Sequence, residues 1–296
     1  MLNFYSTYTM LIDLQIHSTY SDGYLAPTEA AKFLASNGVK IAALTDHNTV
    51  GGLDEFRRAC RKYAVKPITG VELYAKLNHI KFNILWFNFD DKHPELHKLL
   101  RESQQRRRGR VRNILKKLAA RGYKINIDKI LDRYNHYVPI NHLTGDIYSN
   151  SYNRAKTKEI LGIKNPREED IIKTYFQNKE IGVIHETYLD INRILTLRKK
   201  IGGQIVLNHP AKYGYINVDF VKQLKKLKID GIETLSPHHS LGAVMYVQSL
   251  AYDMGFIEIG SSDFHLHEDE KFLLRNSWQY FKIDSRYLKG IEKIIG

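Results

Sequence analysis

The stretch LIDLQIHSTYSDG, residues 11–23, joins a short apolar strand to a polar turn. Side chains alternate between the two faces of a strand, so LIDLQI is expected to place Asp13, Gln15 and His17 on one face and Leu14 and Ile16 in the packing on the other. Polar groups on such a strand are costly to bury without partners. A hydrogen-bonded strand end would satisfy them, but the same pattern, an apolar strand followed by His or Asp, recurs along the chain.

Seven apolar segments of strand length are spread along the chain. They cover residues 11–16, 40–44, 67–73, 81–88, 204–208, 230–235 and 256–261. A helix is expected over 27–37, which has a proline at its start and Gly38 just past its end, and another is expected to close the chain over 285–295. Strands that alternate with helices indicate parallel βα units, so the expected fold class is α/β, with seven strands in a (β/α) barrel.

The alternation stops between about residues 91 and 200. Residues 94–120 carry apolar side chains at helical spacing, which predicts one long amphipathic helix. Over 91–122, eleven Lys or Arg stand against three Asp or Glu, a net charge of +8. We interpret 91–200 as a helical insertion that caps the C-terminal rim of the barrel, within one domain spanning residues 1–296. The basic helix face is either a solvated surface or a funnel for nucleic acid.

The amino-acid composition indicates which classes of protein and which cellular compartments fit this chain. The chain is 43% hydrophobic, which supports a sizeable core, and no apolar run approaches the ~18 residues that a membrane span needs. The first residues have neither a basic start nor a small-residue cleavage pattern, so no signal peptide is expected. The single cysteine, Cys60, excludes an internal disulfide framework and fits the cytoplasm. The net charge of +13 favours polyanions or phosphorylated substrates, and no membrane, as partners.

Polar or titratable residues stand at or near the ends of six of the seven strands. They are His17, His47, Glu72, His209, Glu233, Asp263 and His265, while the fourth strand offers only Asn83. The carboxyl ends of barrel strands share one face, and that face is where catalysis takes place. Imidazoles and carboxylates that converge there predict a divalent metal centre suited to Zn, Mn or Fe. One such histidine would more often be structural, but five independent strand ends favour a site.

Five segments together resemble the successive motifs of the PHP family, the polymerase and histidinol phosphatase superfamily. They are DLQIHSTYSDG, ALTDHNT, GVEL, LNHPAKY and GSSDFH. The long basic helix after the fourth strand is most similar to the subgroup that contains nucleoside 3′,5′-bisphosphate phosphatases and RNA 5′-end exonucleases. The resemblance implies a distorted seven-stranded (β/α) barrel that holds two or three divalent metal ions at its rim.

The resemblance also implies metal ligands, by their positions in these motifs. The residues that look like ligands are His17, Asp22, His47, Glu72, His142, Asp263 and His265. Glu72 resembles a carboxylate that bridges two ions. The most complete set for a single ion is Asp22, His47 and His265. Asp263 is expected to join His17 and Glu72 around a neighbouring ion.

Two ligand positions of the family hold amides in this chain. Gln15 stands where the opening motif has its first His, and Asn83 stands where the fourth strand supplies another. A carboxamide oxygen is a neutral, weaker ligand than imidazole, so Gln15 and Asn83 are expected to lower the metal affinity or change the metal preference. Relatives also carry Arg before the insertion histidine and at the end of an HPxR motif, where this chain has Asn141 and Lys212. Lysine keeps a positive charge for phosphate but lacks the bidentate fork of arginine.

The implied reaction is hydrolysis of a phosphate ester of a nucleotide or an RNA 5′ end by metal-activated water. The expected catalytic residues are Asp263, His265, His209 and Lys212. Phosphate is expected to bind Lys212 and arginines of the long helix, taken from Arg106, Arg107, Arg108, Arg110 and Arg112. Two alternatives stay open: a relative that binds nucleic acid or a phosphorylated ligand without turnover, and a small-molecule phosphatase. The histidines expected only at the surface or in ordinary hydrogen bonds are His93, His97, His136, His185, His238, His239 and His267.

Overall fold

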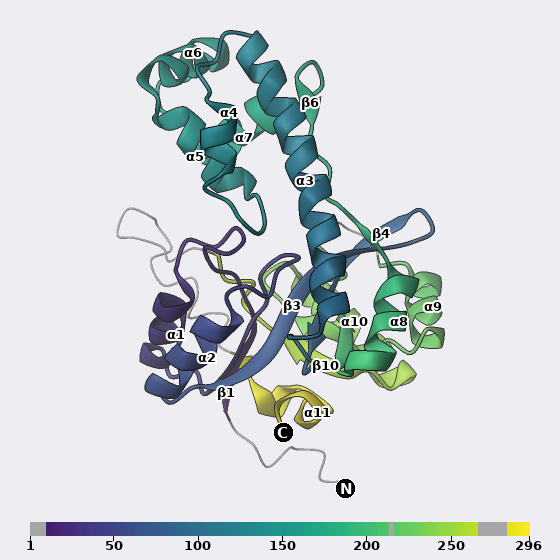
Figure 1. The fold of residues 1–296 in the computed structure, drawn as a ribbon. Helices are drawn as coiled ribbons and strands as arrows, with labels where there is room; N and C mark the ends of the chain where they lie inside the picture. The colour runs from purple at the N-terminus through teal and green to yellow at the C-terminus, as the bar shows by residue number, and fades with distance from the viewer. Residues whose placement is uncertain (1–9, 213–215, 266–282) are drawn as a thin grey trace, which may run out of the picture. The chain divides into compact units, whose positions relative to one another are not determined.

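The structure, a computed structural model, describes residues 10–212, 216–265 and 283–296 (Figure 1). His267 therefore lies outside the described residues. The chain separates into two compact units, one formed by Met1–Leu96 with Tyr188–Gly296 and the other by His97–Thr187. The second unit falls inside the predicted insertion, residues 91–200. That the insertion belongs to one domain and caps the rim stays a prediction.

The first unit is built on one strongly curved sheet. Its seven main strands are β1 (Leu11–Ile16), β2 (Ile41–Leu44), β3 (Lys66–Leu77), β4 (Ile80–Phe87), β8 (Gln204–Leu207), β9 (Gly231–Leu235) and β10 (Ile257–Gly260). Two short strands, β7 (Leu189–Asp190) and β11 (Ile283–Asp284), pair with β3 and β1 and raise the number in the sheet to nine. A parallel bridge between Ile16 and Phe264 brings the end of β10 back to β1, so the sheet nearly closes into a barrel. The predicted α/β barrel is confirmed, with two strands more than expected.

The fourth strand runs opposite to its neighbours. β4 is antiparallel to both β3 and β8, whereas β1–β2–β3 and β8–β9–β10 pair in parallel. Only Asn78 and His79 separate β3 from β4, and a parallel connection needs a crossover of about a dozen residues or more. The prediction of parallel units throughout is therefore wrong at β4. The reversal distorts the barrel at this strand.

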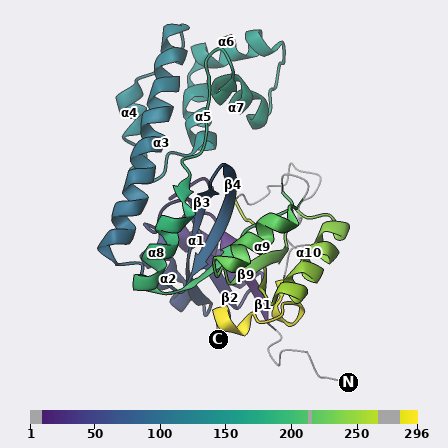
Figure 2. The ribbon, with the colours of Figure 1, turned by 90° about the vertical axis from the view of Figure 1, so that its right-hand side faces the viewer.

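Helices cover the outside of the sheet. They are α1 (Pro27–Ser36), α2 (Leu53–Lys62), α8 (Ile191–Ile201), α9 (Val218–Lys226) and α10 (Leu241–Met254) (Figures 1 and 2). Proline at the first position of α1 suits its fixed backbone angle and its missing N–H. The predicted closing helix is wrong as one piece: the 3₁₀ turn η2 (Ser285–Tyr287) and the short α11 (Glu292–Ile295) replace it. Gly290, with φ +75°, interrupts the helical path between them.

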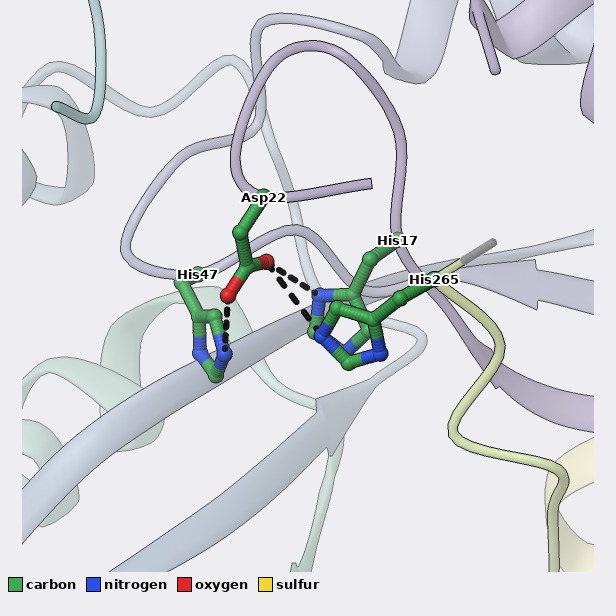
Figure 3. Close-up of side chains that lie close together, drawn as sticks. All are labelled: His17, Asp22, His47 and His265. Atoms are coloured by element: carbon green, nitrogen blue, oxygen red, sulfur yellow. Dashed lines mark ion pairs between the residues drawn. The ribbon is translucent and has the colours of Figure 1, made fainter. Parts of the chain in front are cut away.

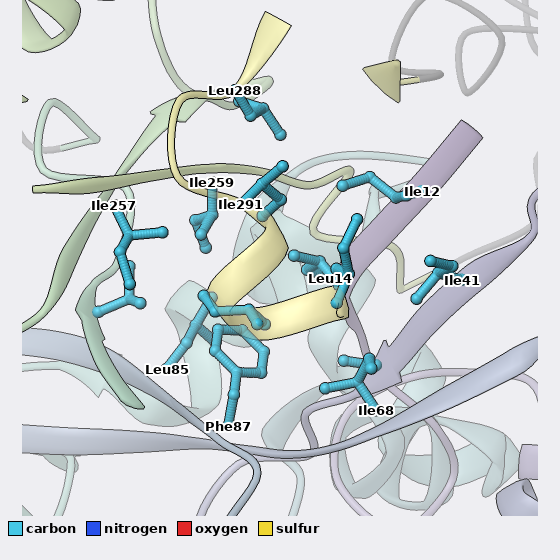
Figure 4. Packing of buried hydrophobic residues seen from close by; sticks show 14 of the residues in the cluster. Ile12, Leu14, Ile41, Ile68, Leu85, Phe87, Ile257, Ile259, Leu288 and Ile291 are labelled. Carbon is cyan, nitrogen blue, oxygen red and sulfur yellow. The ribbon is translucent and has the colours of Figure 1, made fainter. Parts of the chain in front are cut away.

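An apolar cluster fills the barrel from one end. Side chains of β1, β2, β3, β4, β8 and β10 meet side chains of the C-terminal segment there, such as Leu288 and Ile291 (Figure 4). Members of the cluster include Ile12, Leu14, Ile41, Ile68, Leu85, Phe87, Val206, Ile257, Ile259, Leu288 and Ile291. Glu72 lies four residues after Ile68 on β3, and Asn83 lies two residues before Leu85 on β4, which runs in the opposite direction. On each strand the polar side chain therefore shares a face with a core residue. The core therefore fixes the strands that present the polar site.

β1 does not alternate strictly between its two faces. Leu14 belongs to the core cluster, yet Gln15, the next residue, also reaches Glu72. The pairing of β1 with β2 shifts register between Asp13 and Ile16, which is the mark of a β-bulge. A bulge re-aims side chains and is frequent beside active sites. The predicted alternation therefore fails between Leu14 and Gln15, whereas Gln15 and His17 lie on one face as predicted, since both contact Glu72. The bulge lets one short strand contribute to both the core and the site.

The second unit is helical and has a core of its own. It contains most of α3 (Pro94–Ala120), together with α4 (Ile127–Leu131), α5 (Ile140–Ser149), α6 (Ser151–Leu161), α7 (Glu168–Phe176) and a hairpin of β5 (Gln177–Asn178) with β6 (Gly182–Val183). Val111, Leu115 and Leu118 of α3 are buried against Tyr175 and Phe176 of α7. The predicted long amphipathic helix is confirmed over its full length. Across the described ranges, we find no helix that has both the length and the apolar character needed to cross a membrane.

Candidate metal centre

The turn after β1 is held by a buried aspartate. Asp46, which follows β2, accepts hydrogen bonds from the Ser18 backbone N–H at 2.7 Å, the Ser18 hydroxyl at 2.7 Å and the Ser21 hydroxyl at 2.6 Å. Gly23 closes the turn so tightly that a Cβ atom there would lie 2.2 Å from the His17 carbonyl oxygen. This short, braced turn holds His17 at one end and Asp22 near the other.

Asp22 stands among three imidazoles (Figure 3). Its Oδ1 lies 3.5 Å from His17 Nδ1 and 3.4 Å from His265 Nε2, and its Oδ2 lies 3.5 Å from His47 Nε2. The rings of His17 and His265 stack with centroids 4.1 Å apart. These four residues form a group that could hold a metal ion, with ligand atoms within 4.8 Å of one another. We call them the Asp22 group.

His17, Glu72 and Asp263 form a second such group, the Glu72 group. His17 Nε2 lies 3.1 Å from Glu72 Oε2 and 3.2 Å from Asp263 Oδ1. All three side chains are buried. Asp263 has φ +50°, a left-handed conformation that residues other than glycine rarely adopt and that clusters at functional sites. The structure thus brings together the sets of side chains that the sequence groups around two ions; that these side chains are ligands stays a prediction.

The three carboxylates are stabilised in their charged form. Burial raises the pKa of Asp22, Glu72 and Asp263, but the surrounding imidazoles outweigh it and hold the pKa of each well below its usual value. His47 is the strongest opposing influence on Asp22 and Glu72, and His265 is the strongest on Asp263. Three charged carboxylates therefore lie close together, and bound protons or cations must balance their negative charge.

The pKa values of the three imidazoles shift in two directions. Burial lowers the pKa of His17, yet its contacts with Asp263 and Glu72 raise the pKa well above the usual value. The pKa of His265 is also raised, because Asp22 and Asp263 outweigh burial and the neighbouring His17. Burial dominates at His47 and lowers its pKa. Without a metal ion, protons on His17 and His265 supply part of the positive charge, and a bound cation would replace them.

The donor chemistry fits a divalent ion. Imidazole nitrogens and carboxylate oxygens are the ligands that Zn and similar borderline cations take. His17 Nε2 is a buried polar atom that makes no regular hydrogen bond. Such an atom is costly to bury without a partner, and a cation or a proton can supply one.

Gln15 and Asn83 also lie at the centre, where they contact Glu72. Gln15 donates to Glu72 Oε2 at 2.9 Å, and Asn83 donates to Glu72 Oε1 at 2.7 Å. Asn208, which the sequence did not single out, donates to the same Oε1 at 2.9 Å. Its signal was its position directly before His209, at the end of a strand.

The expected phosphate and proton-transfer residues of the barrel lie beside the two groups. Lys212 Nζ is 3.3 Å from Asp263 Oδ2, and His209 Nε2 is 3.4 Å from Glu72 Oε1. His238 was expected only in an ordinary or surface role, but its Nε2 lies 2.6 Å from Asp263 Oδ2. The sequence feature that could have identified His238 is its position three residues after β9, since the other site histidines also come shortly after strands.

Glu233 lies behind this layer. It is fully buried and accepts a hydrogen bond from the His209 backbone N–H at 2.7 Å and another from the Ser261 hydroxyl. Burial raises the pKa of Glu233 to about 7. Glu233 therefore connects the loops after β8 and β10 and helps to position His209.

The remaining predicted residues lie in the helical unit. Arg107 is buried there: it donates to the Val138 carbonyl, pairs with Glu186 and stacks on the Tyr137 ring. Arg110 donates to two backbone carbonyls, those of His185 and Glu186. Arg108 and Arg112 pair with Asp132 and Asp128, and Arg106 is exposed on α3. His142 is in the first turn of α5. The phosphate-binding role of these arginines and the ligand role of His142 stay predictions.

Comparison with known proteins decides the family. The PHP domain family matches residues 13–199, more than half of the chain. This chain belongs to the PHP family. The expected membership is confirmed, and so, at the level of the family, is the expected enzyme class, a metal-dependent phosphoric ester hydrolase.

Relatives of this PHP protein carry several activities in their names. A 5′-3′ exoribonuclease of Haemophilus influenzae is 28% identical over 222 residues, which cover 75% of each chain. A phosphoribosyl 1,2-cyclic phosphate 1,2-diphosphodiesterase of Eggerthella lenta is 26% identical and covers 86% of this chain and 94% of its own. A 3′,5′-nucleoside bisphosphate phosphatase of Chromobacterium violaceum is 25% identical and covers 86% and 87%.

Solved structures share the fold. A protein of Bifidobacterium adolescentis, assigned as a metal-dependent phosphoesterase, superposes with a TM-score of 0.71 at 16% identity, over 91% of this chain and 92% of its own. An amidohydrolase of Chromobacterium violaceum superposes with a TM-score of 0.68 at 24% identity, over 86% and 87%. Both share the barrel fold described above at less than 25% sequence identity.

Proposed function

We propose that this chain hydrolyses a phosphate ester of a nucleotide or of an RNA 5′ end, with water activated by a divalent metal ion. The observation that carries the proposal is the Asp22 group: one carboxylate surrounded by three imidazoles at 3.4–3.5 Å. When bound there, a divalent ion supplies a Lewis acid for the phosphoryl oxygens and lowers the pKa of water towards neutrality. Mn, Zn and Fe all suit these ligands.

The chain's own residues supply the remaining parts of the reaction. Lys212 is about a quarter exposed and lies at the edge of the centre, where its ammonium group can bind a phosphoryl oxygen. His238 Nε2 contacts Asp263 and can hold a proton at that atom. His209 is placed by Glu233 against Glu72, where it orients that carboxylate. Together these groups bind the phosphate and move protons on one side of the Asp22 group.

A cavity beside the centre supports a nucleotide as substrate. It has a volume of about 250 Å³ and is lined by apolar side chains, among them Phe82, Leu207 and Phe220. Asn83, Asn208 and His209, whose side chains contact Glu72, line the same cavity. Apolar walls with a few polar groups are typical of small-molecule sites. A nucleobase in this cavity would place its phosphate towards the centre.

The charge of the helical unit supports RNA as a substrate. Residues 97–187 contain twenty Lys or Arg and ten Asp or Glu, so this unit carries +10 of the net charge of +13. Neutralising phosphates with basic side chains drives nucleic-acid binding and makes it weaken as salt rises. The names of the exoribonuclease and bisphosphate phosphatase relatives point to the same substrates. A single cysteine fits a reducing compartment, and we propose the cytoplasm as its location.

Hydrolysis assays test the proposal. The protein loaded with Mn²⁺ is expected to release phosphate from adenosine 3′,5′-bisphosphate or mononucleotides from short 5′-phosphorylated RNA, and Asp22→Asn is expected to abolish either activity. Asp253→Asn, a change to an exposed carboxylate on α10, is the matched control and keeps full activity. No turnover of any phosphoester by wild-type protein with metal bound would reject the proposal.

A second candidate function is binding without turnover. It is favoured by the amides on Glu72, because Gln15 and Asn83 occupy positions where the family supplies imidazole ligands. This candidate predicts salt-dependent RNA binding by a protein that stays inactive with metal, and activity that appears when both positions are changed to His. Full activity of the wild type would exclude it.

A further inference from the structure

We propose that this chain holds a single divalent ion, in the Asp22 group, and that the amides of Gln15, Asn83 and Asn208 take the place of further ions around Glu72. The inference deepens the proposed function and depends on it. In this arrangement the hydrogen bonds of the three amides stabilise and orient the Glu72 and Asp263 carboxylates.

Oxygen–nitrogen contacts of two lengths occur at the centre. The Asp22 group has only the longer kind, whereas Glu72 has the longer kind to His47 Nδ1 (3.5 Å) and His209 Nε2 (3.4 Å) and, in addition, the shorter kind to three amides. Tetrahedral ligands at ~2.1 Å from one ion lie ~3.4 Å from each other. In the Asp22 group the oxygen–nitrogen distances are 3.4–3.5 Å, too long for good hydrogen bonds and suited to an ion between the atoms. The amide contacts with Glu72 measure 2.7–2.9 Å, which is the length of a hydrogen bond. No ion fits between an amide nitrogen and a carboxylate oxygen at that separation.

Gln15 links the carboxylates of Glu72 and Asp263. Its Nε2 lies 2.9 Å from Glu72 Oε2 and 2.7 Å from Asp263 Oδ1, so one amide group joins the two carboxylates. A carboxylate only accepts hydrogen bonds, which requires the amide to point its nitrogen towards both. Gln15 Oε1 points away from both carboxylates and lies 3.2 Å from the Ser261 hydroxyl oxygen. To act as a ligand through its oxygen, Gln15 would have to turn over and lose these contacts.

The second carboxylate oxygen of Glu72, Oε1, also accepts hydrogen bonds from amides. Asn83 and Asn208 both donate to Oε1, at 2.7 and 2.9 Å. With Gln15 on Oε2, three neutral donors surround a carboxylate that is 1% exposed. Hydrogen bonds to a buried carboxylate offset its desolvation, as a second cation does in a polynuclear site. Glu72 thus has its partners without a further ion.

His17 cannot serve both groups at once as a neutral ligand. Its Nδ1 faces Asp22, as Figure 3 shows, and its Nε2 faces Glu72 and Asp263. A neutral imidazole has one lone-pair nitrogen, and the other nitrogen carries a proton. If Nδ1 binds an ion with Asp22, the proton is on Nε2, which lies 3.1 Å from Glu72 Oε2 and 3.2 Å from Asp263 Oδ1. This proton, and not a second ion, then lies between the three members of the Glu72 group, which agrees with the three amides.

A metal count tests the inference. Protein stripped of metal is titrated with Mn²⁺ alone, and bound metal is measured by mass spectrometry of the elements together with EPR. The wild type is expected to bind one equivalent without exchange coupling between ions. Gln15→His combined with Asn83→His is expected to bind at least two, with the coupling that adjacent Mn²⁺ ions produce. Asn113→His, on the exposed face of α3, adds the same side chain elsewhere and keeps one equivalent.

The outcomes are distinct. Two or more equivalents in the wild type would overturn the single-ion inference and leave the proposed hydrolase standing. No bound metal in the wild type would overturn the proposed function as well. The double variant must also gain an ion, since a folded variant that still binds one would show that the amides are not what excludes it. The single variant Gln15→His, which changes only the residue between the two carboxylates, decides the same point if the double variant does not fold.

Discussion

His238 Nε2 lies 2.6 Å from Asp263 Oδ2, on the side of that carboxylate opposite to Gln15 and His17, which contact Oδ1. The same Oδ2 receives Lys212 at 3.3 Å. Asp263 is therefore fixed by partners on both of its oxygens. Partners of this kind orient a carboxylate that faces a metal or a reacting group.

We expect His238→Ala to lower kcat by about 10- to 100-fold while the metal count stays at the wild-type value, because Asp263 loses its shortest contact on Oδ2. His238→Gln keeps a donor near that oxygen and is expected to recover part of the loss. His79→Ala, an exposed histidine at the β3–β4 turn, is the control. Unchanged kcat and an unchanged pH profile in His238→Ala would show that this contact has no part in turnover.

Asp46 braces the turn that carries His17 and Asp22, so its removal is expected to lower both stability and metal affinity. Asp46→Ala removes the acceptor of three hydrogen bonds, one of them from the Ser18 backbone. Buried donors left without partners cost about 1–3 kcal/mol each, so the free energy of unfolding is expected to fall by about 3 kcal/mol. Metal affinity is expected to fall too, since His17 and Asp22 lie on this turn.

Urea unfolding in the presence of a chelator measures the stability loss, and a metal titration of the folded variant measures the affinity. Asp253→Ala removes an exposed carboxylate and is expected to change neither. If Asp46→Ala is destabilised but binds metal as tightly as the wild type, the turn supports the fold without positioning the ligands.

Much of the site could be predicted because its residues follow strands. His17, His47 and Asp263 each come shortly after an apolar segment, and the barrel brings such positions to one face whatever the details of packing. The direction of β4 was harder to predict, although the two-residue turn at Asn78 and His79 carried the signal. A short connection excludes a parallel crossover, and that argument outweighs the regular spacing of the strands.

Other features depend on geometry that no local pattern encodes. The bulge in β1 allows Gln15 to point towards Glu72 although Leu14 is in the core, and its cause is the register of pairing with β2. The contacts of Asn208 and His238 arise from residues far apart in the chain. The sequence identified Gln15 and Asn83 as departures from the family. Only the structure shows that both amides donate to Glu72.

Cys60 gives a prediction that does not depend on the metal. The thiol is buried at the inner face of α2, and burial raises its pKa to about 12. Because the thiolate is the reactive form, the folded protein is expected to resist thiol reagents at pH 8, and the unfolded protein is expected to react at once. Labelling with a chromogenic disulfide reagent, with and without urea, checks this. Rapid labelling of the folded protein would contradict the burial of Cys60.

Glu233 predicts how stability depends on pH. Burial raises its pKa from an ordinary value of 4.5 to about 7 in the folded protein. Between these two values the folded state keeps a proton that the unfolded state has lost, so the free energy of unfolding falls as pH rises from about 4.5 to about 7. A difference of this size corresponds to about 3 kcal/mol. The stabilising contribution is therefore complete below pH 4.5 and lost above pH 7.

The variant Glu233→Gln isolates this contribution. Glutamine has a similar shape and no titrating proton, and it can still accept the hydrogen bond from the His209 backbone N–H. The difference in unfolding free energy between wild type and Glu233→Gln, measured by urea unfolding in chelator from about pH 4.5 to about pH 8, is expected to shift by about 3 kcal/mol in favour of the variant as pH rises. Other titrating groups are common to both proteins and cancel in this difference. A flat difference would mean that Glu233 ionises at its ordinary pKa despite its burial.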